Sequence, residues 1–248
     1  MPLYTDQLER TLELKQIPKR IVSLVPSQTE LLFDLGLNEE VVGITKFCVH
    51  PEHWFRTKTR IGGTKQLHLE KIKELQPDLI IANKEENVRE QIEELANYFP
   101  VWISDVNNLN DTLEMIVSIG KLTNKSSQAK EMAAQINESF NQLQTPNSKL
   151  PTCYLIWNDP YMTIGGDTFI NDMLQQSGFQ NIFEDQKRYP EISIQQLQSV
   201  DCQLLLLSSE PYPFKQKHVD ELQPLLPNTK IILVDGEMFS WYGSRLLK

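Results

Sequence analysis

The stretch Asp78-Leu79-Ile80-Ile81-Ala82-Asn83 decides the fold, because the order of elements around it occurs twice in this sequence. Residues 67–105 are typical of a short helix, this apolar strand, a polar loop, a second helix and a second strand. In residues 192–235 the same elements are expected at 193–199, 203–207, 208–210, 215–226 and 230–234. A repeat over this distance predicts two similar α/β lobes, and two lobes make a cleft that suits a ligand.

The first lobe opens with a strand at 20–25 and a helix that starts in a tight turn. Ser27 and Glu30 have the spacing of a capping box, in which each side chain bonds to the backbone amide of the other residue. Gly36 fits a left-handed helix stop. Strand, turn and capped helix predict the start of a parallel α/β unit.

The second lobe opens in the same way, with a strand at 152–157. Asp167 is the expected N-cap of the following helix, and Gly178 is its expected stop.

A long helical stretch separates the two lobes. Segments 111–122 and 126–143 carry apolar residues at spacings of three and four, which predicts two amphipathic helices. We interpret the second, about 27 Å long, as a stiff connection between the lobes. The alternative is a surface helix of lobe one followed by a flexible linker through the loop residues 145–148. The expected domains are 1–108, 109–145 and 146–248.

Composition excludes several classes of protein. The chain has 248 residues, of which 40% are apolar and 23% charged, as in a soluble globular protein. A net charge of −9 without a basic stripe argues against nucleic-acid binding. No apolar run is long enough for a transmembrane helix. We expect a monomer.

The cysteines and the N-terminus bear on the compartment. Cys48, Cys153 and Cys202 form no CxxC pair and are expected to be buried thiols. The first residues lack the charged-then-apolar pattern of a signal peptide. The expectation is that the chain either stays in the cytoplasm or has lost a leader.

Six segments, taken in order, resemble those of a known family; they are 20–30, 67–72, 76–81, 164–170, 178–183 and 189–193. The chain resembles the substrate-binding proteins of ABC importers, in the helical-backbone class that includes cobalamin, haem and ferric-siderophore receptors. The cobalamin-binding proteins are most alike. The resemblance implies two Rossmann-like lobes, one connecting helix, ligand held between the lobes and delivery to a membrane permease. The sequence departs from the family by lacking a secretion signal or lipoprotein cysteine and by a short C-terminal end.

Candidate ligand residues follow from the rule that ligands sit outside the carboxyl ends of strands in open α/β sheets. The loops at those positions are rich in aromatic side chains, which offer a planar ligand wide contact at small entropic cost. In lobe two, contacts are expected from Trp157, Tyr161, Tyr189, Tyr212, Phe239, Trp241 and Tyr242. The resemblance implies further contacts in lobe one from Phe47, Gly63 and Thr64. The alternative for each ring is that it packs only its own loop.

Other polar residues suggest weaker hypotheses. His50 is an alternative axial ligand to a haem or cobalt centre, and a bare metal site built from the few histidines is another alternative. No protein-held metal and no required cofactor are expected; the ligand itself is expected to be a cobalt or iron chelate. Glu70 resembles the acid that pairs with permease arginines in the family, and Glu221 is its counterpart by symmetry. Both also fit plain surface glutamates.

An enzyme is the rival class of function. The sequence lacks the GxGxxG, GxxxxGK[ST], GxSxG and HExxH patterns, so we expect no catalysis. An α/β enzyme with Asp159, Asp167 and Glu191 as acid/base groups is one alternative. A cytoplasmic sensor or storage protein for a corrinoid or similar chelate is another. The favoured function is non-catalytic capture of a bulky metal chelate, cobalamin before haem or a ferric siderophore, for an ABC importer.

Overall fold

The structure, a computed structural model, describes residues 2–143 and 149–248. The chain divides into two compact α/β units, each with its own sheet. Unit 1 contains the residues up to Val106, Asn110–Glu138 and Trp241–Lys248, and unit 2 contains Asn107–Leu109 and Ser139–Ser240. The prediction of two α/β lobes is therefore confirmed.

Unit 1 is built on a parallel five-stranded sheet with strand order β5-β4-β3-β6-β7. The strands are β3 (Ile21–Ser23), β4 (Val41–Ile44), β5 (Thr59–Arg60), β6 (Leu79–Asn83) and β7 (Val101–Ser104). Every residue of β6 is buried. Such a continuous apolar run is typical of a central parallel strand that is covered on both faces.

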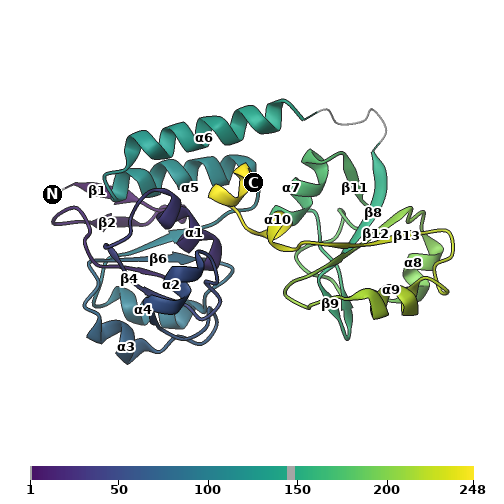
Figure 1. The fold of residues 1–248 in the computed structure, drawn as a ribbon, viewed down its shortest axis with the longest axis horizontal. Coiled ribbons are helices and arrows are strands. Elements are labelled where there is room, and N and C mark those ends of the chain that lie inside the picture. Colours follow the sequence, from purple (N-terminus) through teal and green to yellow (C-terminus); the bar gives the residue numbers. More distant parts are fainter. Residues whose placement is uncertain (1, 144–148) are drawn as a thin grey trace. The chain divides into compact units, whose positions relative to one another are not determined.

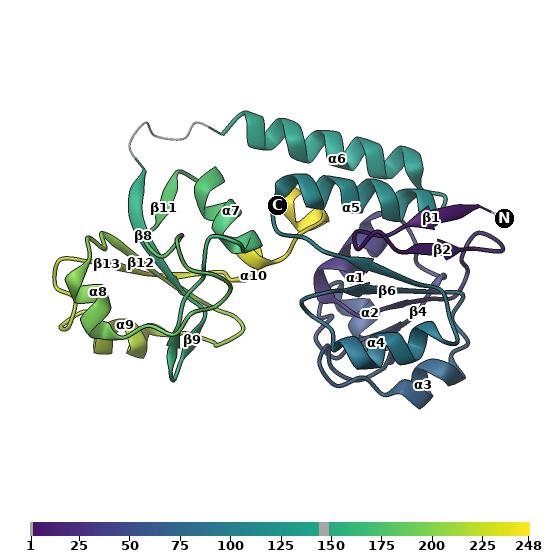
Figure 2. The same cartoon turned by 180° about the vertical axis from the view of Figure 1, so that it is seen from behind.

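Six helices and an N-terminal hairpin accompany this sheet in the sequence (Figures 1 and 2). They are α1 (Pro26–Asp34), α2 (Glu52–Thr57), α3 (Leu69–Glu74), α4 (Arg89–Ala96), α5 (Leu109–Leu122) and α6 (Ser126–Asn141), with β1 (Leu3–Thr5) and β2 (Thr11–Glu13). Helices α5 and α6 run side by side, and a Cβ on Gly120 would lie 2.2 Å from Cβ of Ala129. The glycine therefore permits their close approach. The expected loop at 145–148 lies outside the described residues.

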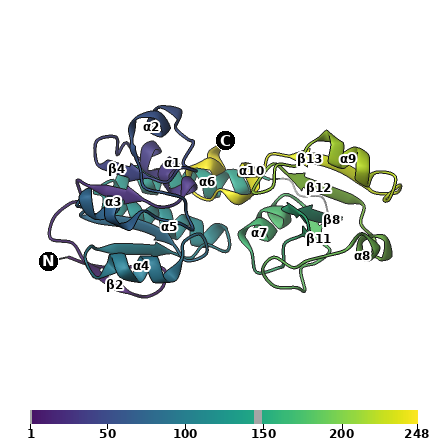
Figure 3. The same ribbon diagram turned by 90° about the horizontal axis from the view of Figure 1, so that it is seen from below.

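Unit 2 has a parallel four-stranded sheet with strand order β11-β8-β12-β13 (Figure 3). The strands are β8 (Leu150–Leu155), β11 (Phe179–Asn181), β12 (Leu204–Ser208) and β13 (Lys230–Val234), with a hairpin of β9 (Trp157–Asn158) and β10 (Tyr161–Met162). The helices are α7 (Phe169–Gln176), α8 (Ile194–Ser199), α9 (Gln216–Leu222) and α10 (Glu237–Ser240).

Alternate residues of the unit 2 strands enter two different apolar clusters. Cys153, Leu205 and Leu207 pack with Leu197 of α8 and Leu222 of α9. A separate cluster joins the intervening strand residues to α7; it contains Tyr154, Leu204, Leu206, Ile170 and Leu174. Because successive side chains of a strand point to opposite faces, the sheet is covered on both sides.

The internal repeat is present as predicted. Helix α3 precedes β6, α4 and β7, and helix α8 precedes β12, α9 and β13 in the same order. The two expected glycine stops are also confirmed, since Gly36 and Gly178 have φ of 78° and 83°.

The expected N-caps were wrong. In α7 the cap is Thr168, whose side chain accepts from the Asn171 amide, while Asp167 accepts from the Arg188 amide at 2.6 Å. Helix α1 begins at Pro26 after Val25 and shows no side-chain cap. Proline has no backbone N–H and is favoured at the first helical position, so the helix begins at Pro26. Ser27 then falls within the first turn instead of at the N-cap.

The C-terminal segment packs in unit 1, whereas the expected C-terminal lobe extended to residue 248. Its 3₁₀ turn, η1 (Ser244–Leu247), contacts α1 (Figure 1). The physical reason is a buried ion pair between Arg245 and Glu30, the residue that the capping box would have used. A buried carboxylate needs such a partner.

Candidate functional site

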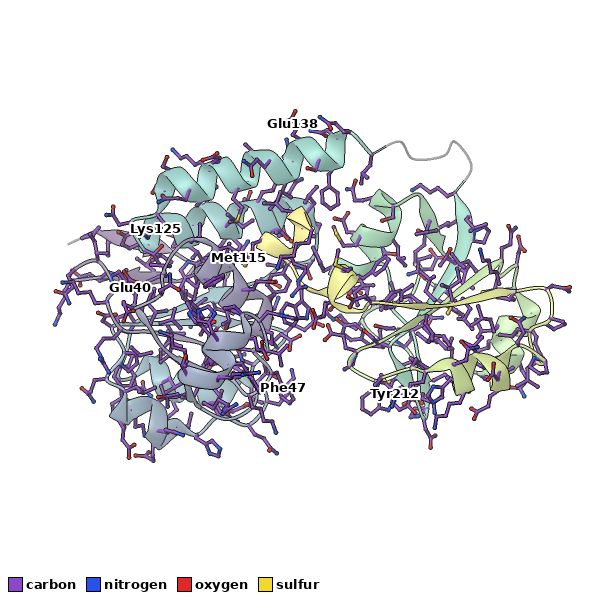
Figure 4. The ribbon with its side chains drawn as sticks, in the orientation of Figure 1. Glu40, Phe47, Met115, Lys125, Glu138 and Tyr212 are labelled. Carbon is purple, nitrogen blue, oxygen red and sulfur yellow. The ribbon has the colours of Figure 1, made fainter. Side chains whose placement is uncertain are left out.

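Polar and aromatic loops follow the strands of unit 1 at the carboxyl edge of its sheet. Phe47, labelled in Figure 4, follows β4, and Gly63 and Thr64 follow β5. The loops are connected through Asn87, whose Nδ2 donates to the Thr64 carbonyl at 3.1 Å. This is the edge at which ligands bind in open α/β sheets.

Phe47 is the exposed aromatic residue of this edge. It is 50% exposed, and Lys46 Nζ lies 5.0 Å from the ring centroid. A Cβ on Gly63 would lie 3.1 Å from Cε2 of Phe47, so the ring rests against the glycine backbone. Thr64 is buried, and its backbone carbonyl accepts the hydrogen bond from Asn87. The structure thus brings the three expected lobe-one residues together.

Trp241 and Tyr242 also lie in unit 1, not in lobe two as the sequence suggested. Trp241 is 6% exposed, with its ring 5.5 Å from His50 and 4.8 Å from the Arg245 guanidinium. Burial raises the pKa of the Tyr242 hydroxyl well above its usual value. Both rings therefore belong to the interior of unit 1, and the expected cluster with Phe239 is divided.

Unit 2 carries an aromatic group at the carboxyl edge of its own sheet. Trp157, on the β9–β10 hairpin, is 40% exposed, and its ring lies 5.7 Å from Tyr212 in an edge-on arrangement. Tyr212, labelled in Figure 4, follows β12 and lies 4.8 Å from Phe214. Its hydroxyl is 3.1 Å from Nε2 of His218 on α9. We call Trp157, Tyr212, Phe214 and His218 the Trp157 group.

Tyr161 packs against the same apolar cluster as Tyr212. Desolvation raises the pKa of its hydroxyl, and the charge of Glu221 is the next cause, followed by Tyr212 and Asp159. The charge of Glu221, expected to dock on a permease, therefore acts on a residue that was expected to bind ligand.

Tyr189 and Phe239 occupy a different place in unit 2. Both pack against the cluster that contains Tyr154 and α7, and the Phe239 ring is 5.3 Å from that of Tyr154. The Arg188 guanidinium lies 5.5 Å from the Tyr189 ring. The expected aromatic residues that do lie in unit 2 thus divide between two apolar clusters of that unit.

Two residues of these edges were not among the expected ligand contacts. Lys46 lies over Phe47, and His218 contacts Tyr212. The available signal for His218 was its position three residues after Lys215, whose backbone amide donates to His218 Nδ1 at 2.9 Å.

The remaining candidates lie elsewhere. Glu70 on α3 is exposed and its carboxylate is 2.8 Å from Lys73 Nζ; Glu221 on α9 is exposed. Within residues 2–143 and 149–248, no three or more His, Cys, Asp or Glu side chains are grouped to hold a metal ion. A cavity of about 370 Å³ in unit 2 is lined by none of the expected ligand residues; Gly166, Asp167, Asn171, Gln175 and 184–187 surround it. No helix among the described parts of the chain is both long and apolar enough to cross a membrane.

Comparison with known protein families identifies the family of this chain. Residues 21–229 match the family described as periplasmic binding protein, which is most of the chain and includes strands of both sheets. The chain belongs to the periplasmic binding protein family.

Relatives of this periplasmic binding protein have different ligands in their names. A vitamin B12-binding protein of Pectobacterium atrosepticum is 24% identical over 241 residues, covering 93% of this chain and 85% of the relative. A periplasmic haem-binding protein of Vibrio cholerae superposes with a TM-score of 0.78 at 20% identity, covering 92% and 94% of the two chains. A siderophore-binding protein solved with acinetobactin and ferric iron has a TM-score of 0.81 at 20% identity, covering 99% and 94%. At this identity the solved structures show the fold alone.

Proposed function

We propose that this periplasmic binding protein captures a bulky metal chelate, cobalamin in preference to haem or a ferric siderophore, and delivers it to an ABC importer without catalysis. The observation that supports this is an exposed aromatic side chain at the carboxyl edge of each sheet, Phe47 in unit 1 and Trp157 in unit 2. Cobalamin is preferred because the named B12-binding relative matches over most of the chain. That one ligand is held between the two units stays a prediction.

The two exposed rings have surface left to bury on a ligand. An aromatic side chain buries about 150–250 Å² in all. Phe47 and Trp157 are 50% and 40% exposed, so each retains a large part of that area. At about 25 cal/mol per Å², covering about 100 Å² of ring contributes about 2.5 kcal/mol before the costs of association.

The acids of the enzyme hypothesis take part in local structure in different ways. The Asp167 carboxylate accepts from the Arg188 amide, whereas Glu191 forms a β-bridge with Met162 through its backbone. Asp159 follows the exposed Trp157, and its carbonyl accepts from Trp157 Nε1 at 3.1 Å. The Asp167 carboxylate therefore has a structural role in holding its loop. A sensor or storage protein for a corrinoid is the second candidate, because it would use the same exposed rings without delivery to a permease.

The ligand claim is tested by titration. Purified protein is mixed with cyanocobalamin, haemin and a ferric siderophore, and binding is followed by visible absorbance and tryptophan fluorescence. We expect at least one to bind with Kd below about 100 μM, or about −5.5 kcal/mol. If none does, the proposed function fails.

Delivery requires docking on a permease, for which we propose Glu70 and Glu221. The two acids lie on exposed helix surfaces, α3 in unit 1 and α9 in unit 2. Both Glu70→Gln and Glu221→Gln should reduce stimulation of the importer's ATPase. Ligand affinity should stay unchanged in Glu70→Gln, whereas Glu221 also acts on Tyr161, an expected ligand residue. Glu74→Gln and Asp220→Asn, exposed acids on the same two helices, are the matched controls. Equal loss in variants and controls would remove both residues from the interface.

A further inference from the structure

Tyr212 and His218 form a hydrogen-bonded pair within the Trp157 group. Oη of Tyr212 lies 3.1 Å from Nε2 of His218. His218 is 3% exposed, and its ring stands edge-on to Tyr212 at 5.4 Å and to Phe214 at 5.3 Å. The imidazole is therefore held in one orientation.

The second ring nitrogen fixes where the histidine carries its hydrogen. The backbone N–H of Lys215 donates to Nδ1 of His218 at 2.9 Å. An amide N–H can only donate, so Nδ1 must present its lone pair. A neutral imidazole with a lone pair on Nδ1 carries its hydrogen on Nε2. His218 Nε2–H is then the donor, and Tyr212 Oη the acceptor.

The opposite assignment conflicts with the backbone. If Tyr212 donated to Nε2, the neutral ring would carry its hydrogen on Nδ1. Two N–H groups would then face each other across the 2.9 Å between Lys215 N and His218 Nδ1. A charged imidazolium meets the same conflict, because it carries hydrogens on both nitrogens.

The consequence falls on Tyr212. A phenolic oxygen that accepts a hydrogen bond still has its own hydrogen to donate to another partner. Tyr212 follows β12 at the carboxyl edge of the unit 2 sheet, is half-buried, and lies beside the exposed ring of Trp157. A flat apolar surface and an oriented donor are thus adjacent.

We propose that His218 orients the Tyr212 hydroxyl to donate to an oxygen acceptor, a carboxylate or amide carbonyl, at the edge of the bound chelate. This inference rests on the proposed function. Tyr212 contacts the ligand, and His218 is a positioning residue because it acts through Tyr212. The pair selects chelates that place such an oxygen next to a face able to lie against Trp157.

The first test needs no ligand. Long-range ¹H–¹⁵N NMR of the labelled protein at neutral pH reports which nitrogen of His218 is protonated, with His218→Asn used to assign the signal. We expect the neutral ring with hydrogen on Nε2. A ring protonated on Nδ1, or on both nitrogens, overturns the inference and leaves the proposed function untouched.

The second test compares affinities for cyanocobalamin and haemin. Tyr212→Phe should weaken binding of the probe that the wild type binds by about three- to tenfold, the value of one hydrogen bond. Asparagine at 218 places its amide near the Nδ1 position and glutamine near the Nε2 position, so His218→Asn should lose affinity that His218→Gln partly restores. Tyr98→Phe, an exposed tyrosine in unit 1, is the matched control.

The outcomes separate the two proposals. If the wild type binds and Tyr212→Phe binds equally well, the inference is overturned and the proposed function stands. If the wild type binds no chelate, the proposed function fails and this inference fails with it. Thermal denaturation of each variant shows that weakened binding reflects the site and not unfolding.

Discussion

Nε of Arg245 donates a hydrogen bond to Oε2 of Glu30 at 2.9 Å, although the residues are 215 positions apart. The two side chains are 9% and 3% exposed, and Lys248 Nζ contacts the other carboxylate oxygen. The pair attaches the C-terminal segment to α1, and that segment brings Trp241 beside His50.

Loss of this ion pair should strongly destabilise the protein. Arg245→Ala leaves the Glu30 carboxylate buried without its main partner, so the free energy of unfolding should fall by about 3–5 kcal/mol in urea titration. Arg89→Ala removes a solvent-exposed pair with Glu93 and should lower the free energy of unfolding far less, because water screens that pair. Similar losses in the two variants would contradict the structural role of Arg245.

Trp157 and Trp241 should respond differently to substitution by alanine. Trp157→Ala removes an exposed ring, and we expect chelate affinity to weaken by about 1–3 kcal/mol with little change in stability. Trp241→Ala empties a buried position and should lower the free energy of unfolding by about 3–5 kcal/mol. Calorimetric titration and urea unfolding measure the two quantities separately. Unchanged affinity in Trp157→Ala would remove that ring from the site.

Gly63→Ala tests the surface presented by Phe47. The added Cβ would lie 3.1 Å from Cε2 of Phe47, so the ring must move. We expect weaker chelate binding, by up to the about 1–3 kcal/mol expected for Phe47→Ala, at a small cost in stability. Gly62→Ala is the contrasting variant: Gly62 has a φ of 102°, and an added Cβ would overlap the Gln66 carbonyl, so we expect lost stability. If Gly63→Ala binds as tightly as the wild type, Phe47 does not contact the ligand.

The buried thiols predict a loss of stability in alkaline solution. Burial raises the pKa of Cys48 and Cys153, and raises that of Cys202 to about 11. A folded-state pKa above the unfolded value gives stability that is complete below about pH 8.5 and is lost as pH rises toward the folded value. The free energy of unfolding should therefore fall from about pH 8.5 to about pH 10, below the range where buried tyrosines contribute.

Cys202→Ala should make this decline shallower, because one of the thiols that ionise only in the unfolded chain is gone. Urea titrations of wild type and variant at matched pH values check this. Parallel pH profiles for the two proteins would show that Cys202 does not contribute.

Local patterns predicted the elements of the fold because their causes lie within a few residues. The apolar runs became the central strands β6 and β12, and Gly36 and Gly178 ended their helices. The N-cap predictions failed because neighbouring residues can each cap the same helix. Thr168 and Asp167 are adjacent candidates for one helix start, and the choice depended on Arg188, which Asp167 binds instead.

The candidate site was predictable as a set of loops but not as a set of contacts. The carboxyl ends of parallel strands share one edge, so Phe47 and Gly63 could be expected together. Tyr189 and Trp157 follow the same rule in sequence, yet Tyr189 packs with the cluster around α7 and Trp157 with Tyr212. The face to which a loop folds depends on packing that spacing does not encode.

The sequence by itself determined two repeated α/β units, their parallel strands and the aromatic character of their loops, because burial pattern and turn chemistry act over short distances. Only the tertiary structure decided that Trp241 and Tyr242 lie in unit 1 and that His218 orients toward Tyr212. Those placements follow from a buried charge pair and a backbone-bound imidazole, whose partners are chosen by three-dimensional packing.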